Sequence, residues 1–182
     1  MDWLNENFGE WKSIPRLYVA IWLVLYFLFL LYAYANAPNF LFVDFANLMI
    51  HEAGHPLFSP FGNTIMLLGG TLFELIVPAA CCIYFFFQRQ PFGVTFCSFW
   101  FFENFLYIGT YMSDARSDTL PLVGSDTSDW LLLFGRWGVL EYDRQIGHTV
   151  RTLGWLGMLL AIAWLIHRSY RSSQPHVKPL EL

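Results

Sequence analysis

Long apolar runs divide the chain into segments of membrane-spanning length. The first run, residues 17–35, contains 19 apolar residues without a charge. An α-helix rises about 1.5 Å per residue, so about 20 residues cross the roughly 30 Å hydrocarbon layer of a bilayer. Three further runs cover residues 64–87, 92–112 and 153–166, and the last reaches spanning length only with its flanking residues. The pattern predicts about four transmembrane helices.

Two other hydrophobic segments do not fit the pattern of a simple span. Residues 41–58 are apolar but carry four ionisable side chains, namely Asp44, His51, Glu52 and His55. We expect them to form a short re-entrant or partly buried helix. Residues 130–140 are apolar around Arg136 and too short to cross, which favours a helix in the membrane interface. Residues 1–167 then form one membrane-embedded domain, and residues 168–182 form a flexible cytoplasmic tail.

Composition supports the same class. Of the 182 residues, 56% are hydrophobic and only 13% are charged, whereas soluble domains average about 25% charged residues. Ten basic against 14 acidic residues give a net charge of −4, so the chain lacks the basic surface that nucleic-acid binding requires. We predict an all-α integral membrane protein whose environment is the lipid bilayer.

Basic residues suggest an orientation for the four spans. They occur before the first span, between the second and third, and after the fourth, and comprise Lys12, Arg16, Arg89, Arg168, Arg171 and Lys178. All lie on one side if residues 41–58 do not cross, and the positive-inside rule makes that side cytoplasmic. The sequence therefore predicts a multi-pass protein with both termini inside and with connections 37–63 and 113–149 outside.

The strongest chemical signal is the pentapeptide from His51 to His55, which has the form H-E-x-x-H. On a helix, two histidines four residues apart share one face and can chelate one Zn²⁺. Glu52 then lies beside the metal, where it can take a proton from a water molecule that attacks a carbonyl. Ionisable side chains inside hydrophobic segments usually mark function, so we predict a zinc site with Glu52 as the general base.

In a membrane protein, this motif in an early hydrophobic segment resembles the site-2-protease class of membrane-embedded zinc metalloproteases. The resemblance covers residues 45–115 and implies that His51 and His55 are zinc ligands. That class follows its zinc helix with a Gly-rich stretch bearing an Asn, and here Glu74 stands at the Asn position after Gly69 and Gly70. The glycine pair itself is typical of close helix packing.

The resemblance also implies a third ligand, an Asp within an Asn…Asp-Gly motif on a later helix. This chain offers Asn104 and Asp114, although Ala115 replaces the glycine. Pro56 directly after the second histidine is a further departure, and we expect it to kink or end the zinc helix.

Topology favours the same aspartate. If residues 41–58 enter from the outer side, the metal lies towards that side, where the span 92–112 ends at Asp114. His148, near the outer start of the last span, is the alternative ligand. Asp126 and Asp129 precede an apolar run and are interpreted as helix-capping acids, with contact to zinc as the lesser alternative.

Glu74, Glu103 and Asn104 lie inside predicted spans. They are candidates to orient the zinc ligands by hydrogen bonding to them, or to serve as alternative ligands. For Glu103 a helix–helix hydrogen bond is an equal alternative.

The leading functional hypothesis is a membrane-embedded zinc metallopeptidase that cleaves a membrane protein or peptide within or near the bilayer. Two alternatives remain. One is a zinc-dependent hydrolase of a lipid amide or ester, and the other is a non-catalytic metal-binding membrane protein. Glu52 distinguishes the enzymatic hypotheses from the non-catalytic one, because a site that only binds metal does not need an acid between its ligands.

Overall fold

The computed structural model describes residues 9–37, 39–117, 119–120 and 127–172, which form helices and no strand. The α-helices are α2 (Arg16–Asn36), α3 (Asp44–Phe58), α4 (Asn63–Phe87), α5 (Pro91–Ser113), α6 (Asp129–Trp137) and α7 (Asp143–Ser172). Two short 3-10 turns, η1 (Ser59–Phe61) and η2 (Leu140–Tyr142), follow α3 and precede α7. The predicted all-α class is confirmed.

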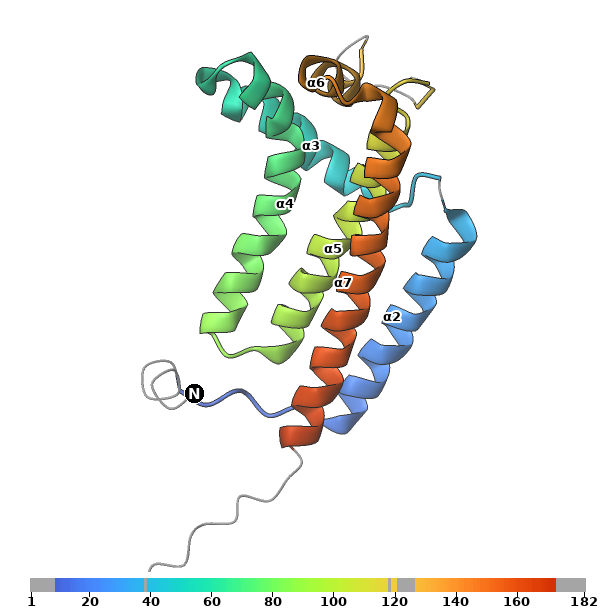
Figure 1. Cartoon of the computed structure of the whole chain (residues 1–182). Coiled ribbons are helices and arrows are strands. Elements are labelled where there is room, and N and C mark those ends of the chain that lie inside the picture. The colour runs from blue at the N-terminus through green and yellow to red at the C-terminus, as the bar shows by residue number, and fades with distance from the viewer. Residues whose placement is uncertain (1–8, 38, 118, 121–126, 173–182) are drawn as a thin grey trace, which may run out of the picture.

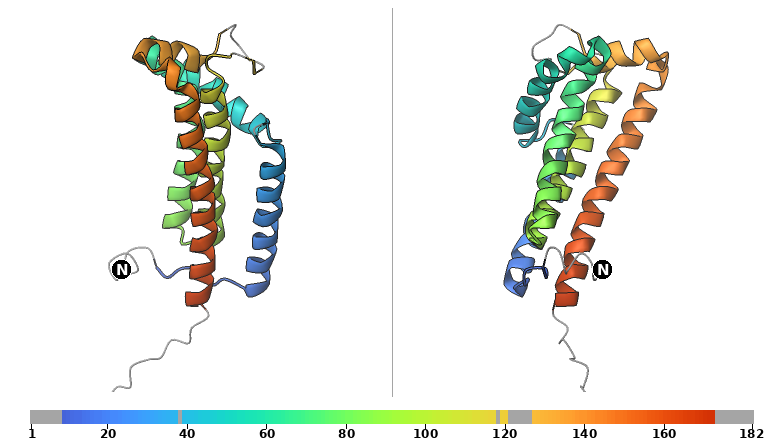
Figure 2. Two further views of the ribbon diagram at one scale, coloured as in Figure 1. Left: turned by 45° about the vertical axis from the view of Figure 1, so that its right-hand side comes forward. Right: turned by 90° about the vertical axis from the view of Figure 1, so that its left-hand side faces the viewer.

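Four long helices run side by side as a bundle (Figures 1 and 2). These are α2, α4, α5 and α7, and the shorter α3 and α6 lie at one end of them. The start of α2, the α4–α5 turn and the end of α7 all lie at the opposite end (Figure 1). We call the end with α3 and α6 the site end, and the other the basic end.

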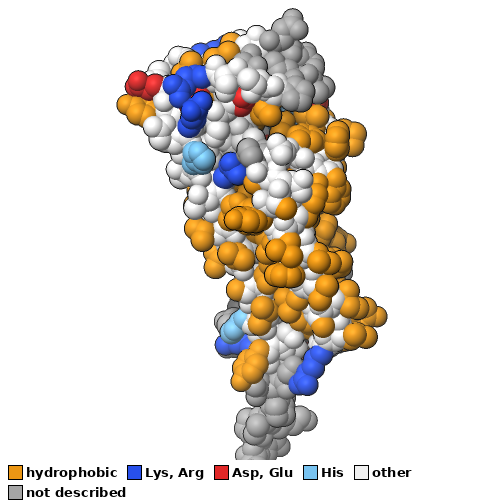
Figure 3. Space-filling view, turned by 90° about the vertical axis from the view of Figure 1, so that its right-hand side faces the viewer, with side chains coloured by type: hydrophobic (Ala, Val, Ile, Leu, Met, Phe, Trp, Pro, Cys, Tyr) orange, Lys and Arg blue, Asp and Glu red, His pale blue; other side chains and the backbone are white. Residues whose placement is uncertain are grey.

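Three segments are long and apolar enough to cross a membrane: Arg16–Asn36, Asn63–Phe87 and Leu140–Ser172. Their outward side chains are apolar as well. Leu17 of α2 is 71% exposed and Leu160 of α7 is 68% exposed. On the face shown in Figure 3, hydrophobic side chains cover the middle of the molecule and charged ones gather towards its two ends. This distribution matches a protein that displays its apolar surface to lipid.

The core of the bundle forms where α5 packs against α7 and α2 packs against α5. Met158 and Leu165 of α7 are fully buried in this cluster, and Leu106 of α5 is buried as well. The aromatic rings of Tyr26 and Phe99 join α2 to α5 at a centroid distance of 4.6 Å. Because α5 also packs against α4 and α7, it is the central helix of the bundle.

Element boundaries differ from the prediction at three places. Pro56 does not end α3, which continues to Phe58 before it tightens into η1. The last helix begins at Asp143 and reaches Ser172, so it is longer than the predicted run 153–166 and includes the start of the expected tail. Residues 173–182 of that tail lie outside the described residues.

The short helix predicted at residues 130–140 is present as α6. It buries Trp130, Leu133 and Phe134 on one face, and Ser128 caps it by accepting the backbone N–H of Leu131. The capping residue is therefore Ser128. Asp129, interpreted above as a capping acid, is the first helical residue, and its side chain is directed elsewhere.

Candidate metal site

Helix α3 places the two histidines of the motif on the face that packs against α4. His51 is 3% exposed and His55 is partly buried one turn further on, with their ring centroids 4.9 Å apart. The donor atoms of His51, Glu52 and His55 all lie within 4.8 Å of one another. The spacing predicted from the sequence is confirmed as a compact group of candidate metal donors.

The Nδ1 atoms of the two imidazoles face different groups of α4. Nδ1 of His55 lies 2.9 Å from the backbone carbonyl oxygen of Met66. This acceptor keeps the proton of the neutral ring at Nδ1 and leaves its Nε2 lone pair free to bind a metal. Nδ1 of His51 lies 3.4 Å from Oε2 of Glu74 without a hydrogen bond between them, so this contact is a charge interaction. Helix α4 therefore selects the tautomer of His55.

The Nε2 atoms of both rings converge on one carboxylate. Oδ2 of Asp129, at the start of α6, lies 3.3 Å from Nε2 of His51 and 3.3 Å from Nε2 of His55. In a tetrahedral zinc site with bonds of about 2.0–2.1 Å, neighbouring donor atoms are separated by about 3.3 Å. The two N–O distances match this spacing, so His51, His55 and Asp129 are candidate ligands for a metal ion.

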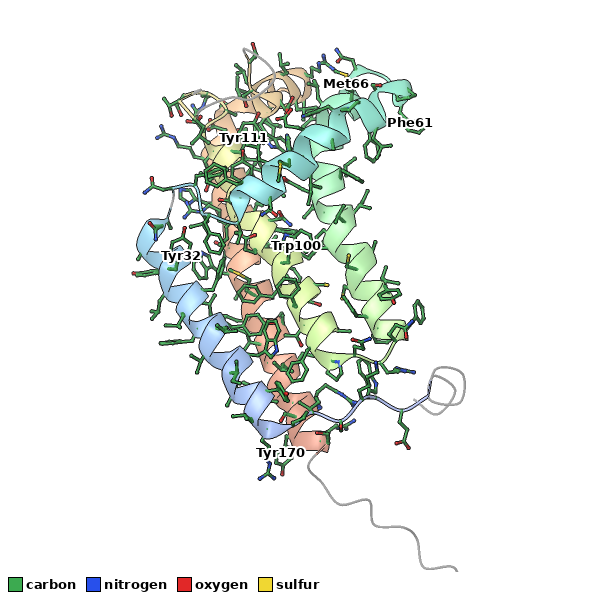
Figure 4. All side chains as sticks on the ribbon, turned by 180° about the vertical axis from the view of Figure 1, so that it is seen from behind. Tyr32, Phe61, Met66, Trp100, Tyr111 and Tyr170 are labelled. Atoms are coloured by element: carbon green, nitrogen blue, oxygen red, sulfur yellow. The ribbon has the colours of Figure 1, made fainter. Side chains whose placement is uncertain are left out.

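Tyr111 of α5 helps to hold Asp129 in place. Its hydroxyl oxygen accepts the backbone N–H of Asp129 at 3.1 Å, and its ring centroid lies 6.0 Å from that of His51. Figure 4 labels Tyr111 and Met66 at the site end of the bundle. Four helices, α3, α4, α5 and α6, thus contribute to one site.

Charges at the site compensate one another. Burial by itself lowers the pKa of His51, but Asp129 and Glu74 outweigh it and raise the pKa to about 9. The contact with Asp129 likewise raises the pKa of His55. Burial would raise the pKa of Asp129, yet the two histidines hold it below its usual range. A bound divalent cation would replace the imidazole protons as the positive partner of Asp129.

Glu52 lies in the same group and is partly exposed, as His55 is, whereas His51 is buried. Its carboxylate therefore has access to water beside the histidine pair.

Glycines bring α3 and α4 close enough to form the site. A Cβ added to Gly54 of α3 would collide with the backbone carbonyl of Gly69, and one added to Gly70 of α4 would collide with the imidazole of His51. The close packing predicted for the glycine pair is confirmed. Gly70 has a specific role, because its missing side chain is the space that the His51 ring occupies.

We expect Gly70→Ala to weaken metal binding by about 10- to 100-fold, the range typical of lost support for a metal ligand. Alanine favours the helix itself by about 1 kcal/mol over glycine, so the loss would come from the displaced His51 ring. Gly135→Ala in α6 is the matched control, because no atom lies within 4 Å of its added Cβ. Zinc affinity measured by competition with a chelator checks this, and equal affinities in both variants would contradict it.

Asp114, the predicted third ligand, is held by the loop that follows α5. Its carboxylate accepts hydrogen bonds from the side chains of Ser117 and Thr119 and from the backbone N–H groups of Thr119 and Leu120. Despite partial burial, these bonds lower the pKa of Asp114. The structure brings Asp129, and not Asp114, to the histidines.

Some of the other predicted site residues lie next to the histidine pair, and the others make no contact with it. Oε2 of Glu74 lies 3.4 Å from Nδ1 of His51, and the side-chain amide of Asn104 donates to the backbone carbonyl of Glu74 at 3.1 Å. Glu103 accepts a hydrogen bond from Asn47 of α3 at 3.0 Å, which is the helix–helix bond named as its alternative. His148 is exposed on α7 and makes no described contact with the pair, and Asp126 lies outside the described residues.

Sequence reasoning considered Asp129 but gave it the wrong local role, and it missed Met66 and Tyr111. Asp129 and His51 are separated by 78 positions in the chain. The predicted topology contained one signal for Asp129. It places the interfacial helix at residues 130–140 and the re-entrant helix at residues 41–58 on the same side of the membrane. An acid at the start of the interfacial helix can therefore contact histidines of the re-entrant helix.

Comparison with protein-family models, with curated proteins and with solved structures finds no match for this chain. The resemblance to the site-2-protease class therefore stays a prediction that rests on the motif.

Proposed function

We propose that the protein is a membrane-embedded zinc metallopeptidase with His51, His55 and Asp129 as the metal ligands. The observation that carries the proposal is the convergence of two Nε2 atoms on one carboxylate oxygen at 3.3 Å each. The hydrogen bond at Nδ1 of His55 supports it, because it fixes the tautomer that binds metal, and Glu74 places a negative charge 3.4 Å from Nδ1 of His51. Two imidazoles and one carboxylate are the donor set found in several zinc peptidases.

Each residue of the site has a chemical task in this proposal. Zinc would supply Lewis acidity, which polarises a carbonyl group and makes water more acidic. Glu52 would accept the proton of the attacking water and deliver it to the leaving amine. Glu74 and the Met66 carbonyl would hold the imidazoles in place, and Tyr111 would hold Asp129 through its backbone.

We further propose that α2, α4, α5 and α7 all cross the membrane, with α3 as a partly inserted helix. Helix α5 has 23 residues and lies side by side with the three segments of spanning character (Figure 1). Alternating directions along the bundle are what four successive crossings require.

Basic residues gather at the basic end, which supports the proposal that both termini are cytoplasmic. The backbone N–H of Lys12 donates to the carbonyl of Arg89 at 3.0 Å, and the guanidinium groups of Arg89 and Arg168 lie 5.2 and 4.7 Å from the ring centroid of Trp11. Three basic segments meet at this end, as the positive-inside rule expects for a cytoplasmic face. The metal site would then lie towards the outer side.

A second candidate is hydrolysis of a lipid amide or ester by the same residues. It requires no change in the proposed chemistry, because zinc and a general base hydrolyse amides and esters alike. A non-catalytic metal site is disfavoured, because it gives Glu52 no task.

The test is metal content combined with hydrolysis. Protein purified in nanodiscs and loaded with zinc is expected to retain one zinc per chain, and His51→Ala is expected to retain none. Single-span peptides and lipid amides in the same nanodiscs, followed by mass spectrometry, separate the two substrate classes. Wild-type protein that retains no zinc would overturn both enzymatic proposals.

A further inference from the structure

A cavity of about 620 Å³ between α2, α3 and α5 is distinct from the metal site and has two chemically different parts. Its walls are apolar, with Trp22 and Phe29 from α2 and Phe96 from α5 among the lining residues. Its polar part is formed by Asn47 and Glu103, which are 1% and 2% exposed. An aromatic chamber that ends on a buried acid suits an amphiphilic ligand.

The polar part has one carboxylate oxygen without a hydrogen-bond donor. Nδ2 of Asn47 donates to Oε2 of Glu103 at 3.0 Å, and Nε1 of Trp100 donates to Oδ1 of Asn47 at 2.8 Å. Oε1 of Glu103 accepts no hydrogen bond from the described residues. Figure 4 labels Trp100 on α5 beside this region. A ligand that donates hydrogen bonds would complete the network.

A second buried acid lies next to Glu103. Asp44, at the start of α3, lies within hydrogen-bond reach of Glu103, so the two carboxyl groups can share one proton and still carry one negative charge, and no other donor among the described residues reaches Oδ1 of Asp44. The residues that line the cavity include no Lys, Arg or His. Arg151 lines a small neighbouring cavity with Asp44 but forms no ion pair with it in the described part of the chain. Charge complementarity at this end therefore favours a cation.

The length of the cavity favours a single chain over a helix. Its lining residues run from Trp22 to Phe29 on α2 and from Phe96 to Glu103 on α5, which is about 10 Å of each helix. A transmembrane helix of about 20 residues is about 30 Å long and would extend well beyond it. One extended hydrocarbon chain fits the volume, and aromatic rings around an ammonium group add cation–π attraction.

Access to the cavity is from the side of the bundle. Helix α2 buries only Val19, Tyr26 and Ala33 among its residues. Leu25 and Phe42, at the rim of the cavity, are 51% and 64% exposed. A chain dissolved in the bilayer can therefore enter without leaving the hydrocarbon layer.

We propose that this cavity binds a single-chain amphiphile with an ammonium head, the head lying at Glu103 and the chain lying between α2 and α5. The site goes beyond the proposed hydrolytic function and does not depend on it. Binding needs neither the metal nor Glu52.

The test uses the full chain in phosphatidylcholine nanodiscs and a 16-carbon amine that carries a diazirine in its chain. Labelling is expected on peptides that contain Trp22 and Trp100. Unlabelled hexadecylamine is expected to displace the probe at a concentration at least about tenfold below that of hexadecanol, because hydrogen bonds to charged groups are the stronger ones. Hexadecanoate is expected to compete least. Chelator-treated protein is expected to label equally, which separates this result from the fate of the metal site.

Two variants locate the site. Glu103→Gln keeps an acceptor for Asn47 but removes the charge, so the amine and the alcohol are expected to compete within about twofold of each other. Ala46→Phe fills the rim and is expected to reduce labelling, whereas Leu28→Phe on the exposed outer face of α2 is expected to leave it unchanged.

Three outcomes would overturn the proposal. One is equal competition by the amine, the alcohol and the acid, which marks ordinary contact with lipid. Another is labelling that Ala46→Phe does not affect. The third is displacement by a 20-residue Leu/Ala helical peptide at lower concentrations than hexadecylamine, which would assign the cavity to a helix.

Discussion

Replacing Asp129 by alanine is expected to abolish stoichiometric zinc binding. The variant loses the carboxylate oxygen that lies 3.3 Å from Nε2 of both His51 and His55. Two imidazoles alone leave the metal one protein ligand short of the usual three. Loss of support behind a ligand already costs about 10- to 100-fold in affinity, so loss of the ligand itself should cost more than about 100-fold. Metal content after dialysis, together with competition against a chelator, measures this.

Asp114→Ala is the matched control. Its carboxylate accepts hydrogen bonds only from its own loop among the described contacts, so the variant is expected to keep one zinc per chain. Circular dichroism of both variants would verify that the helices persist. Zinc retained by Asp129→Ala but lost from Asp114→Ala would assign the third ligand to Asp114, as the family resemblance implies.

Replacing Glu52 by glutamine is expected to separate metal binding from catalysis. The amide has the shape of the carboxylate but cannot accept a proton from water, and a general base contributes about 10²- to 10⁴-fold to rate. We expect hydrolysis to fall by that factor while zinc content stays at the wild-type level. Cleavage rates for the best peptide or lipid identified in nanodiscs provide the measurement.

Glu141→Gln provides the control for loss of negative charge. Glu141 is exposed in η2, and its replacement is expected to leave both zinc content and hydrolysis unchanged. Full activity in Glu52→Gln would remove Glu52 from the mechanism. Loss of zinc from Glu52→Gln would instead make Glu52 a ligand.

Local sequence patterns predicted the elements of the fold well, because they depend on neighbouring residues. The uninterrupted apolar run at 17–35 became α2, and the i, i+4 spacing of His51 and His55 was sufficient to place both rings on one face of α3. The extent of α7 was underestimated, because the polar residues from Asp143 to Thr152 interrupt its apolar pattern without interrupting the helix.

The third member of the site could not be predicted in the same way. The choice between Asp114 and Asp129 depends on which loop folds back over α3, and neither residue carries that information locally. Asp114 has four nearby hydrogen-bond donors that satisfy it within its own loop. Asp129 has the histidines instead, and its contact with His51 joins positions 78 apart in the chain.

The contacts of the buried acids could not be predicted from the sequence either. The sequence predicted that Glu74 and Glu103 are buried, because each interrupts an apolar run. Their tasks differ only through their partners, which are His51 for Glu74 and Asn47 for Glu103.

The position of Asp129 at the start of α6 gives a bound ion a mechanical role. The histidines and their supporting groups belong to α3 and α4, which glycine contacts hold together. Helix α6 joins this pair through Asp129 and a hydrogen bond of 3.0 Å from Arg136 to Thr64, and it joins α5 through the hydroxyl of Tyr111. An ion bound as proposed would therefore link α6 to α3, in place of the imidazole protons that pair with Asp129 when no ion is bound.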